Sequence, residues 1–344
     1  MQLTQIERLQ DIAQRAHLGG ARAQRRPDVD VERLETELRR GIAGEVRFDA
    51  GSRALYASDA SNYRQVPIGV VIPRHADDVM TAVSIARTYG APILGRGGGT
   101  SMAGQSCNVA LVIDFSKYMH RLLALDAQRK QARVQPGLVL DHLVAAAKPH
   151  RLTFPPDPAT HDHCTLGGMI GNNSCGAHSV MGGTTADNVE GLDILTYDGL
   201  RMRVGKTPRE ELDRLTSDAG RRGEIFRGLR TLRDTYEREI RARFPDIPRR
   251  ISGYNLPALL GEREFDVAKS LVGSECTCVL VLEATVRLID SPPFRSLAVL
   301  GYPNVYRAGD HIMEILEHRP LALEGLDRVL AEDLKRMKGA VKGP

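Results

Sequence analysis

The sequence contains no long apolar run. No segment approaches the roughly 20 consecutive apolar residues that a membrane-spanning helix needs. The first sixteen residues include Glu7 and Asp11 and have no uninterrupted apolar core, so they resemble neither a signal peptide nor a membrane anchor. We therefore expect no transmembrane segment and a cytoplasmic protein, with peripheral attachment to a membrane left open.

Cysteine is scarce, and its spacing is not that of a cluster or a disulfide framework. The five cysteines are Cys107, Cys164, Cys175, Cys276 and Cys278. Because the C-x₂-C-x₂-C run of ferredoxins is missing, no iron–sulfur cluster is expected within this chain. Cys276 and Cys278 alternate along a predicted strand, which would place both on one face, and we interpret them as buried thiols rather than a redox pair. Residues 161–164 (HDHC) are potential metal ligands. Neighbouring side chains on one loop rarely converge on a single ion, so we predict no metal site.

The sequence also lacks a large excess of charge of either sign. Lysine and arginine number 47 against 43 acidic residues, for a net charge of +4, and the basic residues are scattered. This distribution argues against nucleic acid as a partner. A hydrophobic content of 42% in 344 residues is enough for a sizeable core, in two domains or in one large domain with an appendage.

The hydrophobic pattern predicts an α+β fold. Helices are expected over 1–26 and 31–40, followed by a strand at 68–72, a helix at 75–89, a strand from 93 and a strand at 110–115. The next region should hold a hairpin over 121–134, a helix at 137–147, a long polar loop over 154–188, strands at 191–197 and 200–204, helices over 208–243, a helix at 266–271 and a strand at 276–289. We divide the chain into N-terminal helices (1–44), a central domain (45–290, with subdomains 45–116 and 117–290) and a further part (291–344).

The further part follows the boundary Ser291-Pro292-Pro293. Its pattern predicts a strand at 296–300, a helix at 306–318, a strand at 321–324 and a helix at 327–337. This is half of a split β-α-β unit, and some fifty residues are too few to close such a unit alone. We expect it to be the incomplete start of a second domain.

The most informative stretch is residues 92–105, PILGRGGGTSMAGQ. It has no lysine, which excludes a P-loop, and Thr100 stands where a dinucleotide fingerprint would place its third glycine. A predicted strand rather than a helix follows it. Consecutive glycines allow backbone N–H groups to form a concavity for an anion, and we predict that this loop binds a pyrophosphate; a flexible glycine turn is the alternative.

Seven ordered motifs resemble one family. IGVVIPRHADDV, GRGGGTSMAG, LVIDF, VQPG, PPDP, TLGGMIGNNSCG and GSE resemble the FAD-binding domain shared by vanillyl-alcohol oxidase and p-cresol methylhydroxylase. Within it, the sequence is similar to the D-2-hydroxy-acid dehydrogenase branch (D-lactate, glycolate and D-2-hydroxyglutarate enzymes). The continuation PPFRSLAVLGYP resembles the long bacterial members that join this flavin half to an iron–sulfur half. The resemblance implies two α/β subdomains of a p-cresol-methylhydroxylase-type domain and the start of a ferredoxin-like cap.

The resemblance also implies the residues that bind FAD. They are Arg96, Gly97, Gly98, Gly99, Thr100, Ser101, Gly104 and Gln105 in the first loop, Pro156, Asp157 and Pro158 beside the flavin ring, Thr165, Gly167, Gly168, Gly171, Asn172, Asn173, Ser174 and Gly176 in the second loop, and Val189 and Glu275. His178, just past the second loop, is the candidate catalytic base, and a merely hydrogen-bonded histidine is the alternative. The family's Gly-Thr-Leu-Gly after GSE is replaced here by Cys276-Thr277-Cys278. Its Arg-Tyr-Gly is replaced around residues 178–182, which leaves the substrate carboxylate site unassigned.

The implied activity is oxidation of a D-2-hydroxy acid by hydride transfer to flavin N5, with electrons passed to an external acceptor such as an iron–sulfur domain or protein. We expect non-covalent FAD, because the first loop offers only Thr100 and Ser101 as nucleophiles; His178 and Cys175 are the remaining candidates for attachment. The alternatives are a non-catalytic FAD-binding fragment and an NADPH-dependent nucleotide-sugar reductase. Since the second domain is not completed, we expect FAD binding with slow or no reduction by hydroxy acids.

Overall fold

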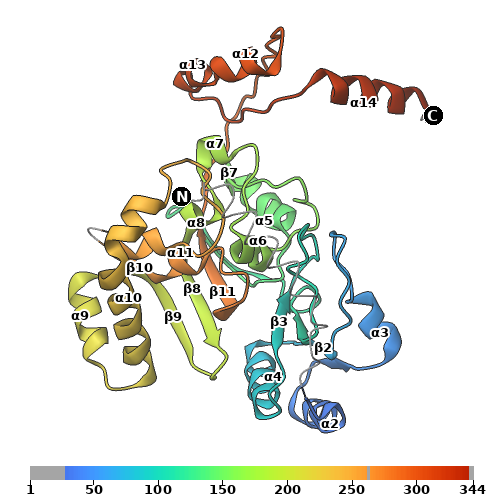
Figure 1. Ribbon diagram of the computed structural model, residues 1–344, viewed down its shortest axis with the longest axis vertical. Coiled ribbons are helices and arrows are strands. Elements are labelled where there is room, and N and C mark those ends of the chain that lie inside the picture. Colours follow the sequence, from blue (N-terminus) through green and yellow to red (C-terminus); the bar gives the residue numbers. More distant parts are fainter. Residues whose placement is uncertain (1–27, 262–263, 341–344) are drawn as a thin grey trace, which may run out of the picture.

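The computed structural model describes residues 28–261 and 264–340. The helix expected over 1–26 therefore lies outside the described residues. Two sheets and the helices that cover them form the body of the molecule, and three further helices follow (Figure 1).

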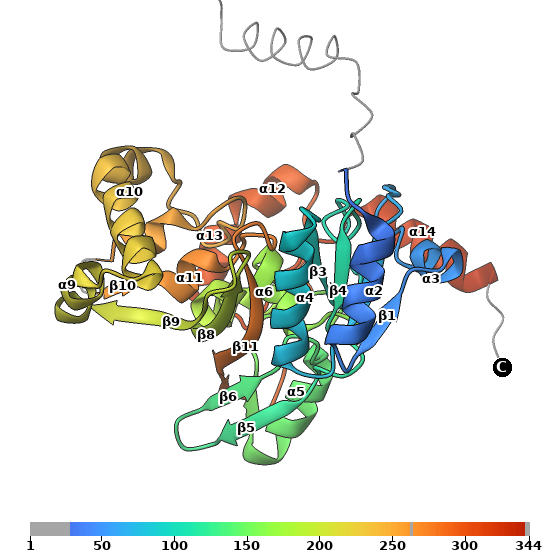
Figure 2. The ribbon, with the colours of Figure 1, turned by 90° about the horizontal axis from the view of Figure 1, so that it is seen from below.

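The first sheet has four strands in the order β1-β2-β4-β3. Its strands are β1 (Glu45–Arg47), β2 (Gly69–Ile72), β4 (Leu111–Asp114) and β3 (Ile93–Arg96). β2, β4 and β3 run parallel, and β1 is antiparallel to β2. Helices α2 (Val31–Gly41) and α4 (Ala76–Thr88) pack together on one face (Figure 2). The strands β2 and β4 are buried at every position, as expected for parallel strands that are covered on both sides.

The second sheet has six antiparallel strands in the order β10-β9-β8-β11-β6-β5. These are β10 (Glu264–Asp266), β9 (Arg201–Pro208), β8 (Val189–Thr196), β11 (Val279–Arg287), β6 (Gln131–Val134) and β5 (Leu122–Asp126). The accompanying helices are α5 (Leu140–Ala147), α9 (Arg209–Ser217), α10 (Arg221–Arg243) and α11 (Val267–Leu271), with short 3₁₀ turns at Lys148–His150 and Leu256–Leu259. The small strands β7 (Leu152–Thr153) and β12 (Ile289–Asp290) pair with each other.

The two sheets share a hydrophobic core. Leu195 of β8 and Leu280 and Leu282 of β11 belong to the same buried cluster as Leu34 of α2 and Val83 of α4. The second sheet therefore packs against the first sheet and its helices through residues of β8 and β11. This contact fixes the distance between the glycine loop after β3 and the strand β11.

Most predicted elements are confirmed. Residues 45–67, for which we predicted no element, contain β1 and α3 (Ala50–Leu55). The polar segment 154–188 is not all loop: it contains α6 (Leu166–Asn172), α7 (Ser179–Gly182) and α8 (Thr185–Asn188), and Met169 and Ile170 are buried.

The cysteine pair is also placed differently from our expectation. β11 begins at Val279, so Cys276 and Cys278 lie in the turn that precedes it, where Cys276 has φ of 61°. Cys276 is half-buried and Cys278 is exposed, so they do not share one buried face. The turn interrupts the alternation that a strand would have imposed.

The part after Asp290 differs most from the prediction. Residues 296–300 and 321–324 form no strand, and Leu297 and Val299 are 90% and 86% exposed. An isolated strand without a neighbour to pair with is not stable, and no described strand lies beside them. Three helices are present, α12 (Val305–Asp310), α13 (Ile312–Glu317) and α14 (Arg328–Ala340), so the helix expected over 306–318 is divided at His311. In Figure 1 this part joins the body next to α7 and β7.

Candidate cofactor site

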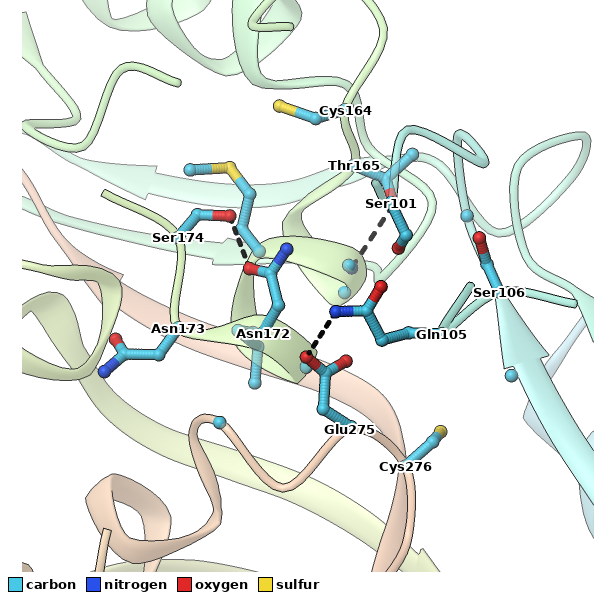
Figure 3. A pocket seen from close by; sticks show the side chains of 18 of the residues that line it. Ser101, Gln105, Ser106, Cys164, Thr165, Asn172, Asn173, Ser174, Glu275 and Cys276 are labelled. Carbon is cyan, nitrogen blue, oxygen red and sulfur yellow. Dashed lines mark hydrogen bonds between the residues drawn. The ribbon is translucent and has the colours of Figure 1, made fainter. Parts of the chain in front are cut away.

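A cavity of about 810 Å³ opens between the two sheets, and we call it the central cavity. Four stretches of the chain line it: the glycine loop after β3, the segment around α6, the residues before the 3₁₀ turn at Leu256–Leu259, and the turn before β11. Figure 3 shows side chains from three of these stretches meeting in one place. Its volume lies in the range that holds a cofactor-sized ligand.

The backbone of the glycine loop packs closely against residues 163–165, where the second loop begins. A Cβ atom on Gly97 would be 2.0 Å from Thr165 Oγ1, and one on Gly98 would be 2.2 Å from the carbonyl oxygen of His163. Gly99 has φ of +67° and therefore adopts the left-handed conformation that favours glycine. Only glycine lets these two backbones approach so closely.

Arg96 holds the glycine loop in place. Its guanidinium donates hydrogen bonds to the carbonyl oxygens of Ser106 (2.8 Å), Ser58 (2.9 Å) and Tyr56 (3.3 Å), and it lies 5.3 Å from the centre of the Tyr56 ring. Arg96 lines the central cavity, but these contacts occupy its donors with backbone oxygens. The structure therefore gives this side chain a positioning role.

The segment before β2 supports the same loop, which the sequence did not indicate. Asp59 accepts hydrogen bonds from the backbone N–H (3.2 Å) and the hydroxyl (3.0 Å) of Ser106, and the N–H of Ala60 donates to the carbonyl oxygen of Gly99 at 3.1 Å. Burial acts to raise the pKa of Asp59, but the hydrogen bonds from Ser61 and Ser106 outweigh it and lower that pKa. An ionised Asp59 thus anchors the far end of the glycine loop.

Helix α6 presents a bare face to the central cavity. Gly168 and Gly171 are three residues apart, so they lie on the same side of the helix. A Cβ atom on Gly168 would meet nothing closer than 3.5 Å, and one on Gly171 nothing closer than 4.0 Å. Because neither glycine has a side chain, the space beside them is part of the central cavity. A planar or extended ligand can therefore lie directly on the helix backbone.

The asparagines after α6 differ from one another. Asn172 lines the cavity and accepts a hydrogen bond from the Ser174 hydroxyl at 2.6 Å (Figure 3). Asn173 has φ of 55°, is 3% exposed, and accepts a hydrogen bond from the N–H of Ala186 at 2.9 Å. Asn173 therefore fastens the loop to α8, whereas Asn172 faces the ligand space.

Glu275 reaches the same space from the turn before β11. Its backbone is left-handed (φ 51°), its N–H donates to the carbonyl oxygen of Gly171 (2.9 Å), and its carboxylate accepts a hydrogen bond from Gln105 Nε2 at 3.4 Å. Burial raises the pKa of Glu275, and the Gln105 contact offsets only part of this effect. Burial likewise raises the pKa of Cys276 to about 11. A half-buried carboxyl group and a protonated thiol thus lie side by side in this turn.

The structure gathers most of the predicted cofactor residues around the central cavity. It is lined by Arg96, Gly97, Gly98, Gly99, Thr100, Ser101, Gln105, Pro158, Thr165, Gly167, Gly168, Gly171, Asn172, Asn173, Ser174 and Glu275. Gly104 borders a neighbouring cavity of about 590 Å³, which Gln105 and Glu275 border as well. Val189 is buried at the start of β8 and lines none of these cavities.

Three predicted residues lie elsewhere. Pro156, Asp157 and His178 line a smaller cavity of about 220 Å³, which shares no lining residue with the central cavity. Asp157 accepts a hydrogen bond from the N–H of His178 at 2.8 Å and contacts His178 Nδ1. Gly176 lines neither of these two cavities, and a Cβ atom on it would be 2.1 Å from the carbonyl oxygen of Asp157. The expected position of His178 on the central cavity is therefore not found.

Residues 251–254 line the central cavity and were not predicted. The hydroxyl groups of Tyr254 and Thr277 are 2.8 Å apart, which joins this segment to the turn before β11. The only signal in the sequence was Gly253, which has φ of +74°. A single glycine in a polar segment does not reveal such a role.

The histidines of 161–164 have separate partners. His161 Nδ1 lies 2.8 Å from Asp141, and His163 Nδ1 lies 2.7 Å from Asp162. Within the described residues, no group of three histidine, cysteine or acidic side chains is arranged to hold a metal ion. In the same part of the chain, no helix combines the length and the apolar character needed to cross a bilayer.

Comparison with known proteins identifies the class. Residues 67–205 match the profile of the family described as an FAD binding domain. An alkyldihydroxyacetonephosphate synthase matches with a TM-score of 0.54 and 18% identity, over 76% of this chain and 41% of that one. A BBE-like enzyme of Physcomitrella patens matches with a TM-score of 0.51 and 17% identity, over 75% and 44%. These likenesses confirm the p-cresol-methylhydroxylase-type fold.

The matched region, residues 67–205, is similar to an FAD binding domain, and FAD is its cofactor. It is 32% identical over 300 residues to D-2-hydroxyglutarate dehydrogenase of Pseudomonas putida, over 86% of this chain and 30% of the relative. It is 28% identical to glycolate oxidase subunit GlcD of Bacillus subtilis, over 83% and 52%. The chain thus spans less than a third of the first relative and about half of the second. The geometry fits the cofactor, because the glycine loop at the cavity wall, the side of α6 without side chains and the size of the central cavity suit an extended dinucleotide.

Proposed function

We propose that the protein oxidises a small 2-hydroxy acid of the D configuration to the 2-oxo acid. The observation that supports this proposal is the central cavity, where two glycine-rich loops are in contact and one side of α6 has no side chains. The relatives of this chain are named as enzymes that act on 2-hydroxyglutarate and glycolate. When bound, FAD supplies the two-electron chemistry and accepts the hydride that leaves the hydroxyl-bearing carbon.

The residues that would hold FAD have distinct roles. We assign the backbone of Gly97 to Ser101 to the pyrophosphate, while Gly168 and Gly171 leave room for the cofactor along α6. The attachment should be non-covalent, because Thr100 and Ser101 are the only nucleophiles in the first loop. Acid precipitation should release all the yellow colour to the supernatant, and colour retained in the pellet would exclude this proposal.

His178 is the proposed base for the hydroxyl proton. Asp157 contacts its Nδ1, which leaves Nε2 as the nitrogen that can accept a proton. Asp157 also accepts the backbone N–H of His178, so one carboxylate fixes both the ring and the chain that carries it. In this proposal Asp157 is a positioning residue, rather than the contact to the flavin ring that the family resemblance implied.

Electrons would then pass to an external acceptor. We propose an iron–sulfur domain or protein, which is supported by the name of the Bacillus subtilis relative as a subunit and by the missing ferredoxin motif in this chain. A cytoplasmic location remains part of the same proposal.

The test is anaerobic stopped-flow measurement of flavin absorbance. The FAD-loaded protein is mixed with glycolate, with the D and L forms of lactate and 2-hydroxyglutarate, and with NADPH. Bleaching by a D acid and not by its L form would support the proposal. Bleaching by NADPH alone would favour a nucleotide-sugar reductase, and a stable flavin with every reagent would favour a non-catalytic FAD-binding unit.

A further inference from the structure

Residues 245–254 form one wall of the central cavity, and we call them the flap. They connect the end of α10 to the 3₁₀ turn at Leu256–Leu259. The flap residues that line the cavity are Ile251, Ser252, Gly253 and Tyr254. Every residue of the flap is exposed except Arg250, which is half-buried. Because the same residues face both the cavity and the solvent, this wall is a single chain thick.

The flap has almost no backbone hydrogen bonds. Pro245 and Pro248 have no N–H group, and no other N–H of the flap donates to a backbone carbonyl oxygen among the described residues. Within the same part of the chain, the one flap carbonyl that accepts a backbone hydrogen bond is that of Tyr254, from the N–H of Leu256 at 2.9 Å. High exposure and few backbone hydrogen bonds are typical of segments that open locally at a low cost in free energy.

The other three walls of the central cavity are held firmly. Arg96 and Asp59 fix the two ends of the glycine loop. Helix α6 is packed into the core through Met169 and Ile170, which are buried. The turn before β11 is bonded to α6, because the N–H of Glu275 donates to the carbonyl oxygen of Gly171 at 2.9 Å. The flap is therefore the wall that can move most easily when a large ligand enters or leaves.

Two side-chain hydrogen bonds tie the flap to the rest of the described residues. Arg249 Nη2 donates to the carbonyl oxygen of Gly176 at 3.0 Å. The hydroxyl groups of Tyr254 and Thr277 are 2.8 Å apart. The Thr277 hydroxyl has a single proton, which it donates to the carbonyl oxygen of Ser274, so Tyr254 is the donor in this pair. The connection between the flap and the turn before β11 thus depends on one phenolic hydroxyl group.

From these contacts we infer that the flap is a gate for FAD, and that the hydrogen bond from Tyr254 to Thr277 keeps it closed. When this bond breaks, the flap separates from the turn before β11 and the cofactor can pass. When it forms, the flap covers the bound cofactor. Tyr254 is then a positioning residue, because it holds the flap through Thr277. Such a gate serves the cofactor and is independent of which acid is oxidised.

The test measures the rates of FAD association and dissociation in Tyr254→Phe, which keeps the aromatic ring and removes the hydroxyl group. If the flap must open before FAD passes in either direction, a weaker bond to Thr277 increases the open fraction with and without FAD. We expect both rate constants to rise about 2- to 12-fold, as for the loss of one hydrogen bond, while Kd stays nearly constant. Rapid mixing of apoprotein with FAD and rapid dilution of the FAD-loaded protein, both followed by flavin fluorescence, give the two rate constants.

Two further variants and a control complete the experiment. Thr277→Val removes the acceptor, and the double variant tests whether the two residues act through one contact. Because a single hydrogen bond joins them, the double variant should be no faster than the faster single variant. Tyr236→Phe is the matched control, since Tyr236 is an exposed tyrosine of α10 outside the cavity lining, and it should keep both rate constants.

The pattern of the two rate constants separates a gate from a direct contact. Faster association together with faster dissociation in Tyr254→Phe supports the inference. Faster dissociation with unchanged association would mean that Tyr254 only contacts bound FAD, and this result would overturn the gate. Unchanged rate constants in Tyr254→Phe would overturn it as well, and so would independent, multiplicative effects in the double variant. Matching circular dichroism spectra of the variants and the wild type verify the fold.

Discussion

At the scale of single residues, two side chains serve mainly to hold the backbone of the glycine loop. They are Arg96, which the sequence marked as a ligand, and Asp59, which it did not. Arg96 donates to three backbone oxygens, and Asp59 accepts from Ser106 and Ser61, so together they hold both ends of the glycine loop. In the proposed function, the N–H groups of the loop bind the phosphates.

The role of Arg96 can be tested by comparing Arg96→Lys with Arg96→Met. A lysine keeps the positive charge but cannot donate to three carbonyl oxygens in the planar geometry of a guanidinium. We expect both variants to bind FAD at least about tenfold more weakly and to lose about 1–3 kcal/mol of stability, because the carbonyl oxygens of Tyr56 and Ser106, which are at least partly buried, lose their donor. Fluorescence titration with FAD and chemical unfolding measure these effects. Near-wild-type FAD affinity in Arg96→Lys alone would show that charge, and thus direct phosphate binding, is what matters.

Glu275 should give the apoprotein a specific pH dependence. Burial raises its pKa in the folded protein above the unfolded value, so the folded state binds the proton more tightly. Its contribution to stability is therefore present below the unfolded pKa and is lost as pH rises through the folded pKa. We expect Glu275→Gln to remove this loss, so that the variant is more stable than the wild type at neutral pH and equal to it at acid pH.

Urea unfolding of apoprotein across this pH range is the measurement. Glu239→Gln, at an exposed position of α10, is the control and should keep the wild-type dependence. A Glu275→Gln protein that follows the wild-type curve at every pH would contradict the assignment of a buried, destabilising carboxylate.

At the scale of elements, α6 explains why two kinds of glycine occur in the second cofactor loop. Gly167 packs on Pro136, where a Cβ atom would be 2.7 Å from a neighbouring carbon, whereas Gly168 and Gly171 face open cavity. We assign the first kind to the fold and propose that the second kind leaves room for the ligand. The sequence alone shows only a run of glycines and cannot separate the two.

This distinction predicts different outcomes for Gly171→Leu and Gly98→Ala. In Gly171→Leu the new Cβ atom meets nothing closer than 4.0 Å, the rest of the side chain would occupy the central cavity, and leucine favours helix, so the apoprotein should unfold at or above the wild-type temperature and yet fail to bind FAD. In Gly98→Ala the Cβ atom would lie 2.2 Å from the His163 carbonyl oxygen, so FAD binding and stability should both fall.

Calorimetry of the apoproteins and FAD titration separate these effects. Gly228→Ala is the control, because a Cβ atom there meets nothing within 4 Å in the exposed helix α10, and it should keep both properties. FAD binding of wild-type strength by Gly171→Leu would place the cofactor somewhere other than along α6.

The sequence predicted what local pattern determines. The helix α4 and the strands β2, β4 and β8 follow from apolar periodicity, and the glycine loop follows from composition. The turn before β11 was mistaken for strand because Glu275 and Cys276 adopt left-handed backbone conformations. Non-glycine residues rarely adopt this conformation, and the sequence pattern does not predict it. Asp59 and Tyr254 were missed because their roles depend on contacts with Ser106 and Thr277, 47 and 23 residues away in the chain.

At the scale of the whole molecule, the site exists because two sheets share one core. Leu195, Leu280 and Leu282 pack into the cluster that covers the first sheet, and the cofactor loops lie along that junction. The assignment of residues 291–344 to a substrate-binding cap stays a prediction. Its apolar side chains Phe294, Leu297 and Val299 are 86–90% exposed in the structure.

The central claim is that FAD lies between the two sheets, along the glycine loop and α6. Hydrogen–deuterium exchange of the apoprotein and the FAD-loaded protein tests it most directly, because amides covered by a ligand exchange more slowly. We predict slower exchange in peptides from residues 96–106, 165–175 and 273–277, and unchanged exchange in α9 and α10, which lie outside the cavity lining. Slower exchange confined to α9 and α10, with no change in the glycine loop or α6, would contradict the account.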